Sequence, residues 1–392
     1  MTNRPFWILP VLIFSQFAGT SLWFAGNAII SDLQVNWNLH PASIGWVTSS
    51  VQFGFITGTL CFAFFTISDV FSPRKVFFVC SILGALANIN IYLLADGLTS
   101  LLIFRFLTGF FLAGIYPVGM KIASGWYKDG LGRAMGFLVG ALVLGTAFPH
   151  LIKGLGGALH WNSVIISVSC LCVLGGLLMF LLVPDGPYLY KGTKFNYKAI
   201  YHIFSSKDLR ASAFGYFGHM WEIYTIWAFI PVLLAAYSAL HGTEINIPVW
   251  AFVFIACGAL GCFLGGIISR KKGSATVAFY QLAISALCCA FSPLLFDAPE
   301  IIFFLVLIIW GITVAGDSPQ FSTLTAETAP KEYVGSALTI VTCIGFSITI
   351  FSIEFVNYVL TILDPRYVFI LLTPGPIAGL FYFLPLYKKR LS

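Results

Sequence analysis

Twelve long apolar runs, separated by short polar breaks, dominate this sequence of 392 residues. A helix needs about 20 apolar residues to cross the hydrocarbon core of a bilayer. The runs lie near residues 6–30, 42–68, 75–95, 98–122, 132–156, 161–183, 210–238, 246–269, 274–296, 300–322, 333–362 and 366–387. They are continuously apolar, whereas the strands of a β-barrel would alternate. The sequence therefore predicts an all-α membrane protein with twelve transmembrane helices.

The charged residues support this prediction. Only 9% of the residues are charged and 59% are hydrophobic, which is too little charge to cover a soluble domain. Seventeen of the 21 Lys and Arg residues fall on one side of the predicted bundle when the amino terminus is placed in the cytoplasm. These are Arg4, Arg74, Lys75, Lys128, Arg133, Lys191, Lys194, Lys198, Lys207, Arg210, Arg270, Lys271, Lys272, Lys331, Lys388, Lys389 and Arg390. This asymmetry predicts that both termini are cytoplasmic. It also explains the net charge of +6 without a nucleic-acid partner.

Several classes of chemistry lack their sequence signals. All nine cysteines lie inside apolar runs and none has the spacing of a metal site, so we expect neither a metal nor another cofactor. No nucleotide-binding loop and no paired catalytic motif occurs, which argues against an ATP-driven pump and against an enzyme. The first apolar run has no small-residue cleavage site, so it is predicted to be an uncleaved helix.

An internal repeat divides the chain. The longest polar break, 184–209, follows six predicted helices, so we expect two bundles, 1–183 and 210–392, joined by a cytoplasmic linker. Trp23, Trp46 and Gly54 recur 204 residues later as Trp227, Trp250 and Gly258. Gly109, Ala113, Gly114 and Pro117 recur 202 residues later as Gly311, Ala315, Gly316 and Pro319. Each half has six helices, which is an even number, so both halves begin on the same side of the membrane and share one topology. They therefore form a parallel pseudo-repeat.

Three local motifs add a family resemblance. They are the segment 66–75 after the second helix, with Asp69 and Arg74; Arg105, Gly109 and Gly114 in the fourth helix; and Gly136, Gly145 and Pro149 in the fifth. Over its whole length the chain resembles the major facilitator superfamily, and helices 7 and 10 resemble a bacterial permease branch. The resemblance implies a monomeric transporter in the bacterial inner membrane that moves a small solute by rocking two bundles. The helix 5 motif slightly favours export.

Ionisable groups inside the spans are functional candidates, because a charge at mid-membrane costs several kcal/mol unless it has a partner or faces water. Arg105 could orient helices through a salt bridge, bind an anionic group, or tune a neighbouring acid. Glu222 and His219 are one turn apart on helix 7, on one helical face. Burial disfavours a charged Glu222 whereas a nearby cation favours it, so we expect this pair to carry protons, with Arg105 modulating Glu222. Structural pairing and a metal site are the alternatives.

Other polar residues are expected to gate the transporter. Asp317 in helix 10 and Lys121 in helix 4 occupy one layer of the repeat, so a pair between them could form a cytoplasmic gate or a fixed bridge. The resemblance implies that Asp69 rests on the amino end of helix 11 and, with Arg74 nearby, latches the outward-facing state. Three further polar residues in spans have no assigned role, namely Glu354, Asn357 and His150.

The substrate site is predicted from aromatic and polar residues of helices 1, 2, 4 and 7. An apolar wall with a few directional groups is typical of small-molecule sites. The predicted residues are Trp23, Asn27, Gln52, Arg105, Tyr116, Trp221, Tyr224 and Trp227. We expect a proton-coupled transporter that exports a small amphipathic solute, with proton-coupled uptake of a small anionic metabolite as the alternative. A channel or a membrane-embedded enzyme is a more distant alternative. Membrane lipids and protons are the other expected partners.

Overall fold

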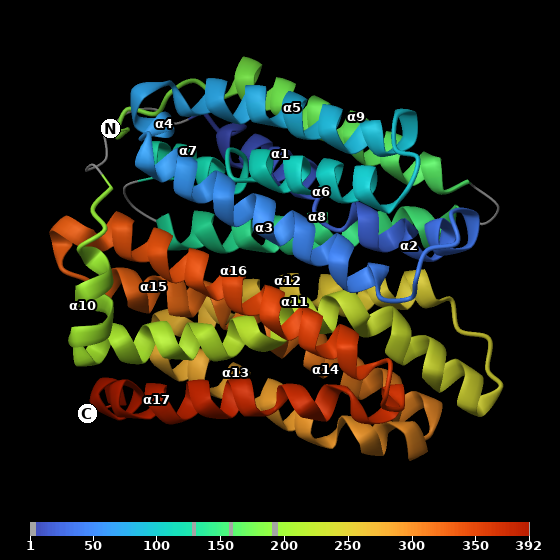
Figure 1. The fold of residues 1–392 in the computed structure, drawn as a ribbon. Coiled ribbons are helices and arrows are strands. Elements are labelled where there is room, and N and C mark those ends of the chain that lie inside the picture. The colour runs from blue at the N-terminus through green and yellow to red at the C-terminus, as the bar shows by residue number, and fades with distance from the viewer. Residues whose placement is uncertain (1–4, 128–130, 157–159, 190–194, 392) are drawn as a thin grey trace. The chain divides into compact units, whose positions relative to one another are not determined.

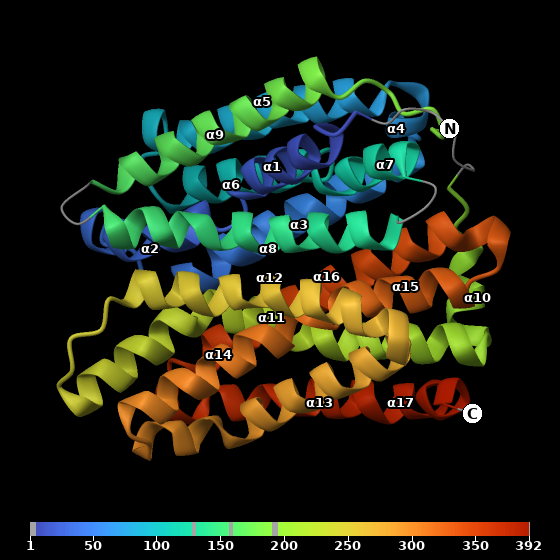
Figure 2. The same cartoon turned by 180° about the vertical axis from the view of Figure 1, so that it is seen from behind.

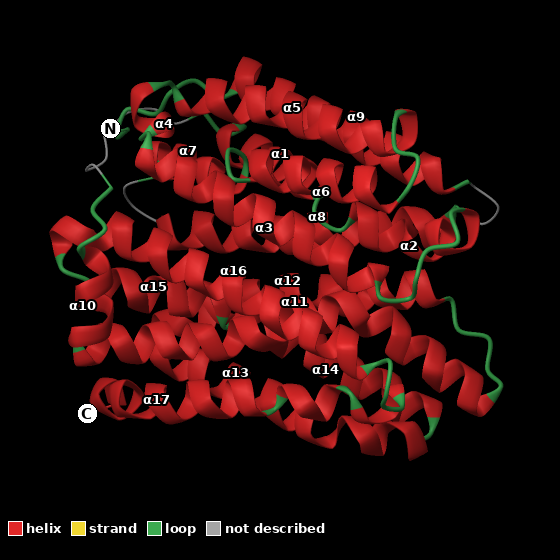
Figure 3. Cartoon of the chain, in the orientation of Figure 1, coloured by secondary structure: helices red, strands yellow, loops and turns green. Residues whose placement is uncertain are grey.

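The structure is a computed structural model that describes residues 5–127, 131–156, 160–189 and 195–391. Arg4, Lys128, Lys191 and Lys194 lie outside these ranges. All regular secondary structure within the described ranges is helical (Figure 3). The chain separates into two compact units, Met1–Phe195 (unit 1) and Asn196–Ser392 (unit 2), which are described one at a time. Their boundary lies inside the segment 184–209 that the sequence marks as a linker.

Within the described residues, twelve helical segments are long and apolar enough to cross a membrane. They are Ile8–Asn36, Ser43–Phe64, Pro73–Leu93, Leu98–Trp126, Leu131–Leu155, Trp161–Leu182, Lys207–His241, Ile247–Lys272, Ser274–Asp297, Glu300–Thr328, Lys331–Val359 and Pro365–Leu391. Each coincides with one of the twelve predicted runs, so the all-α fold class is confirmed. Several spans are longer than predicted, because polar residues at their ends continue the helix.

Unit 1 contains six spans that run roughly along one axis (Figure 1). Its helices are α1 Ile8–Thr20, α2 Ala25–Asn36, α3 Ser43–Phe64, α4 Ile67–Val70, α5 Pro73–Leu93, α6 Leu98–Leu112, α7 Tyr116–Trp126, α8 Leu131–Leu155 and α9 Trp161–Leu182. The helix α1 packs against α8 and α9, whereas α3 packs against α6.

Unit 2 also contains six spans (Figures 1 and 2). Its helices are α10 Ala199–Ser205, α11 Lys207–His241, α12 Ile247–Lys272, α13 Ser274–Phe291, η1 Ser292–Asp297, α14 Glu300–Gly316, α15 Ser318–Thr328, η2 Lys331–Tyr333, α16 Val334–Val359, η3 Pro365–Tyr367, η4 Phe369–Leu372 and α17 Pro374–Leu391. The helix α11 packs against both α16 and α17. The short α10 lies crosswise at the end of α11 (Figure 1).

Glycines bring one pair of helices into close contact in each unit. A side chain at Gly54 of α3 or Gly109 of α6 would overlap the backbone of the other helix. Gly261 of α12 and Gly311 of α14 do the same in unit 2. Small residues allow such close backbone approach in membranes. The α3–α6 contact of unit 1 thus has a counterpart in the α12–α14 contact of unit 2.

Three of the described spans break part-way along their length. The fourth span breaks between α6 and α7, just before Pro117, and the tenth breaks at Asp317, just before Pro319. Proline cannot donate a helical hydrogen bond and clashes with the preceding turn, so both breaks follow from the repeated proline. The first span breaks at 21–24, where Ser21 Oγ donates to Ala18 O at 2.7 Å. Such back-bonding bends helices. The breaks place polar backbone inside the spans.

Candidate functional site

Arg105 lies at the break in the first span. Its side chain is fully buried, and its Nη1 and Nη2 donate to the backbone oxygens of Leu22 and Trp23, the former at 3.0 Å. At the non-helical turn the Leu22 carbonyl accepts only a long 3.4 Å backbone bond from Ala25 N, so the guanidinium supplements the weak local pairing there. Gly26 makes room for the guanidinium, because a Cβ there would lie 2.9 Å from Arg105 Nε. Arg105 therefore caps the broken helix.

The break also brings three of the predicted substrate-binding residues together. Trp23 Nε1 donates to Gln52 Oε1 at 3.3 Å, and Asn27 Nδ2 donates to Thr48 Oγ1 at 2.6 Å. Gln52 Nε2 and Asn27 Oδ1 are buried and have no hydrogen-bond partner among the described residues. A buried polar atom of this kind needs a water or a ligand to satisfy it. Thr48 joins this group although it is not among the predicted residues; its position one turn before Gln52 is the available signal.

Two other predicted residues of unit 1, Tyr116 and His150, lie in the fourth and fifth spans. Tyr116 is half-buried at the start of α7, directly after the break in the fourth span. His150 is buried in α8, with its ring 6.5 Å from that of Phe24, and its Nε2 has no hydrogen-bond partner among the described residues. His150 thus lies next to the broken segment of the first span.

The predicted gating residues of unit 1 have partners within that unit. Lys121 Nζ lies 2.5 Å from Asp69 Oδ1 and donates to Ser68 O at 2.7 Å. Arg74 points elsewhere, with Nη1 donating to Phe180 O at 3.4 Å. Asp69 pairs with Lys121 of the fourth span, and the predicted contact of Asp69 with the amino end of helix 11 stays a prediction.

In unit 2, Asp317 pairs with a histidine. His219 Nδ1 of α11 lies 2.8 Å from Asp317 Oδ1, and both side chains are at most 1% exposed. Lys121 and Asp317 therefore each have a partner other than the one predicted. Asp317 lies between two helix ends: the carboxyl end of α14, where the helix dipole disfavours an acid, and the amino end of α15, where the dipole favours one.

Glu222 extends this buried group. Its side chain is fully buried, and Cys289 Sγ of α13 donates to Glu222 Oε2 at 3.2 Å. Glu222 follows His219, which contacts Asp317, by three residues on the same face of α11. We name His219, Glu222 and Asp317 the acid–histidine cluster. The sequence predicts the first two as partners on one helical face, whereas Asp317 and Cys289 join them only through the packing of α13 and the α14–α15 break.

The aromatic residues of α11 face two directions. Tyr224 and Trp227 are buried together, with ring centroids 5.3 Å apart, and Tyr224 also packs on Phe346 of α16. Trp221 instead lines a groove between α16 and α17, so it does not share a face with the other two. In α16, Asn357 Nδ2 donates to Glu354 Oε2 at 3.4 Å, which joins two of the polar residues without an assigned role.

Within the described residues, no group of three His, Cys, Asp or Glu side chains is placed to bind a metal ion. Two polar groups stand out in the described spans. One is the break at 21–24 of unit 1 that Arg105 caps, and the other is the acid–histidine cluster of unit 2. Both sit at helix interruptions. Broken helices carry the substrate and ion sites in many transporters.

The sequence matches the family profile described as the Major Facilitator Superfamily over residues 11–353. The chain belongs to the major facilitator superfamily. Its members are transporters, so the coarse part of the predicted function stands, and no curated protein sequence matches the chain closely enough to narrow it.

Solved structures of this superfamily share the fold. A proton:xylose symporter, XylE, aligns with a TM-score of 0.75 at 11% identity, covering 98% of this chain and 96% of the other. A mutant form of a nucleoside transporter, NupG, aligns with a TM-score of 0.72 at 13% identity, covering 97% and 99%. An inward-facing, unoccupied bacterial homologue of the human lysosomal transporter Spinster has a TM-score of 0.68 at 13% identity, covering 100% and 97%. At these identities the likeness establishes the major facilitator fold and no substrate.

Proposed function

We propose that this superfamily member is a secondary active transporter that exports a small amphipathic solute in exchange for protons. It works as a monomer by alternating access in a bacterial inner membrane, with both termini in the cytoplasm. The observation that carries the proposal is the acid–histidine cluster, in which two carboxyl groups and one imidazole are buried together inside unit 2. The proposed export direction rests on the helix 5 motif.

Charge balance makes this cluster a proton-binding site. His219 can neutralise one of the two acids when its imidazole is protonated, and its Nδ1 lies 2.8 Å from Asp317 Oδ1. A second buried carboxylate without a counter-charge would cost several kcal/mol. The ion pairs that Arg366, Lys389 and Arg390 form in unit 2 are with acids at the ends of spans. Glu222 is therefore protonated while it is buried, and it releases the proton when water reaches it.

The location of Asp317 links proton binding at the cluster to the bend in the tenth span. It sits at the junction of α14 and α15, so a change in its pairing with His219 acts on the point where the tenth span bends. Helix interruptions are places where small changes in charge can be converted into helix movement. Proton binding and release at the cluster would thus alter the angle within one span of unit 2.

The proposed solute site in unit 1 suits an amphipathic molecule. Gln52 offers a buried donor and Asn27 a buried acceptor, next to the aromatic wall of Trp23 and Phe55, whose rings lie 4.8 Å apart. A solute with a hydroxyl or amide group on an apolar body would satisfy both. Uptake of an anion is less favoured, because Arg105 and Lys121, two cations in the fourth span that could bind an anion, already have oxygen partners.

Transport in proteoliposomes tests the proposal. We expect a screen of amphipathic solutes to give efflux that a pH gradient accelerates. Glu222→Gln should abolish the effect of the gradient but retain solute exchange, since a neutral amide mimics the protonated acid. Glu300→Gln, at the first turn of α14, is the matched control and should behave like the wild type. Flux that is indifferent to the pH gradient in the wild type would refute proton coupling.

A second measurement needs no solute. Infrared difference spectra between acidic and alkaline pH detect the C=O stretch of a protonated carboxyl group. We expect a band that Glu222→Gln removes and Glu300→Gln retains. A wild-type spectrum identical to that of Glu222→Gln would show that Glu222 holds no exchangeable proton.

A further inference from the structure

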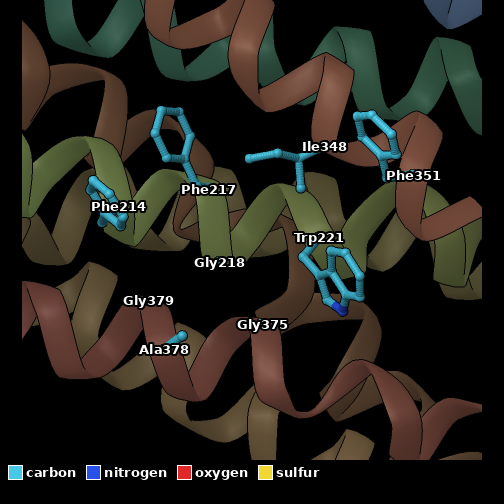
Figure 4. Close-up of a pocket in the computed structure, with 9 residues that line it drawn as sticks. All are labelled: Phe214, Phe217, Gly218, Trp221, Ile348, Phe351, Gly375, Ala378 and Gly379. Carbon is cyan, nitrogen blue, oxygen red and sulfur yellow. The ribbon is translucent and has the colours of Figure 1, made fainter.

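A groove opens between α16 and α17 of unit 2, with α11 as its floor (Figure 4). Its volume is about 310 Å³, which falls at the lower end of small-molecule pockets. Gly218 of α11 and Gly375 and Gly379 of α17 let these two helices approach closely along one side of the groove, and aromatic and aliphatic side chains form the walls. The lining residues are Phe214, Phe217, Gly218, Trp221, Ile348, Phe351, Gly375, Ala378 and Gly379. All belong to candidate membrane spans, so the groove lies within the depth of the bilayer.

One stripe of α11 leads into this groove. Lys207, Arg210, Phe214, Phe217 and Trp221 are spaced alternately three and four residues apart, so they share one helical face. The basic residues stand at the end of the span and the aromatic residues follow inward. The stripe therefore changes from cationic to apolar along the direction in which a lipid changes from headgroup to chain.

The cationic end has the features of a membrane interface. Lys207 and Arg210 are exposed, and Arg210 Nη1 donates to Phe204 O at 3.0 Å, which leaves its other N–H groups to face outward. The neighbouring Asp208 is neutralised by Lys389 of α17, at 2.5 Å. Tyr201 of the crosswise α10 is 70% exposed, as is typical of tyrosines at the headgroup level.

We propose that this groove binds one anionic phospholipid, with its phosphate on Lys207 and Arg210 and one acyl chain running along the stripe to Trp221. The length supports this assignment. Eleven residues separate Arg210 from Trp221, which is about 16 Å along a helix. Half the hydrocarbon core of a bilayer is about 15 Å. A chain anchored at the headgroup level thus ends at Trp221. Two cationic side chains at a single position suit a phosphate-containing anionic headgroup.

The groove is separate from the acid–histidine cluster on which the proposed proton coupling rests. The cluster faces α13 and the α14–α15 break, whereas the groove faces α16 and α17. A protein partner fits less well. Phe351 at the rim is 71% exposed within a candidate span, where the surrounding medium is hydrocarbon. A lipid chain covers such a surface without a specific protein.

Native mass spectrometry of the purified full-length protein tests the site, with phosphatidylglycerol and phosphatidylcholine of identical chains as probes. We expect phosphatidylglycerol to bind at least tenfold more tightly. Lys207→Gln with Arg210→Gln should weaken phosphatidylglycerol binding about 10–30-fold, at roughly fivefold per charge, and leave phosphatidylcholine unchanged. Lys271→Gln with Lys272→Gln, an exposed basic pair at the end of α12, is the matched charge control.

Filling the groove with a larger side chain tests whether a lipid acyl chain occupies it. Ala378→Trp should weaken binding of both lipids, whereas Ile377→Trp, next to it but outside the groove, should not. Equal affinity for the two lipids in the wild type would overturn the headgroup assignment, and unchanged binding by Ala378→Trp would overturn the groove. If Ala378→Trp fails to fold, phosphatidylglycerol with a photoreactive chain end decides instead. Crosslinks to α11, α16 or α17 near Trp221 support the site, and crosslinks confined to other helices refute it.

Discussion

Replacement of Arg105 by methionine tests the capping role that the structure assigns to the guanidinium. Methionine keeps most of the apolar stem but removes the two buried hydrogen bonds to the carbonyls of Leu22 and Trp23, and the Leu22 carbonyl then keeps only a long 3.4 Å bond from Ala25 N. Loss of each buried hydrogen bond to the charged group costs about 1–3 kcal/mol, so the direct loss is about 2–6 kcal/mol. Removal of the buried, unpaired Nε offsets about 1–3 kcal/mol of this loss. The expected net destabilisation is about 1–3 kcal/mol.

Thermal unfolding in detergent measures this change. A cooperative unit of about 150–250 residues loses roughly 2–4 °C for each kcal/mol, so the expected fall in Tm is about 2–12 °C. Hydrogen exchange should also accelerate at residues 21–24. Arg105→Lys should be intermediate, since an ammonium group can satisfy one carbonyl well but lacks the fork that reaches two.

Arg74→Met is the matched control for this experiment. Its guanidinium is half-buried and makes a long 3.4 Å bond to Phe180 O, so the loss in Tm should be smaller. If Arg105→Met keeps the wild-type Tm and exchange rates, the guanidinium does not cap the break. A lysine variant less stable than the methionine variant would also contradict the argument, because it would mean that the charge itself dominates.

The remaining predictions concern packing, the Lys121 pair and the solute site. Gly54→Val should force α3 and α6 apart and lower Tm. Gly136→Val, where an added Cβ meets nothing within 4 Å, should leave Tm unchanged. Equal shifts in Tm for the two variants would refute the close contact. Lys121→Met should remove the ion pair with Asp69 and speed proteolysis or hydrogen exchange around residues 66–70. Asp69→Asn should show the same pattern. Unaltered hydrogen exchange in both variants would show that the pair does not hold this loop. Gln52→Leu should weaken solute affinity about 10-fold or more relative to Gln34→Leu, an amide near the end of the first span. Gln52 has a buried donor without a partner among the described residues, whereas Gln34 Nε2 donates to Pro41 O. Equal affinities would remove Gln52 from the site.

The number and placement of the spans could be predicted from the sequence, because hydropathy and length are local properties of each segment. The repeat of Pro117 as Pro319 likewise indicated matching positions in the two halves, and both spans break there. Candidate ionisable groups were also visible, since Arg105, Glu222 and Asp317 stand out in apolar runs. A charged residue in a span needs a partner, and this much follows from the sequence.

The identity of each partner was decided by tertiary structure. Arg105 binds backbone carbonyls that exist as acceptors only because the first span breaks at 21–24, and no side-chain pattern marks a carbonyl as available. Asp317 meets His219 instead of Lys121, because the α14–α15 break lies against α11 within unit 2. Trp221 and Tyr224, three residues apart, lie on different faces of α11, one in the groove and one against Phe346. Hydrophobicity selects which segments enter the membrane, whereas the packing of those segments selects which buried polar groups meet.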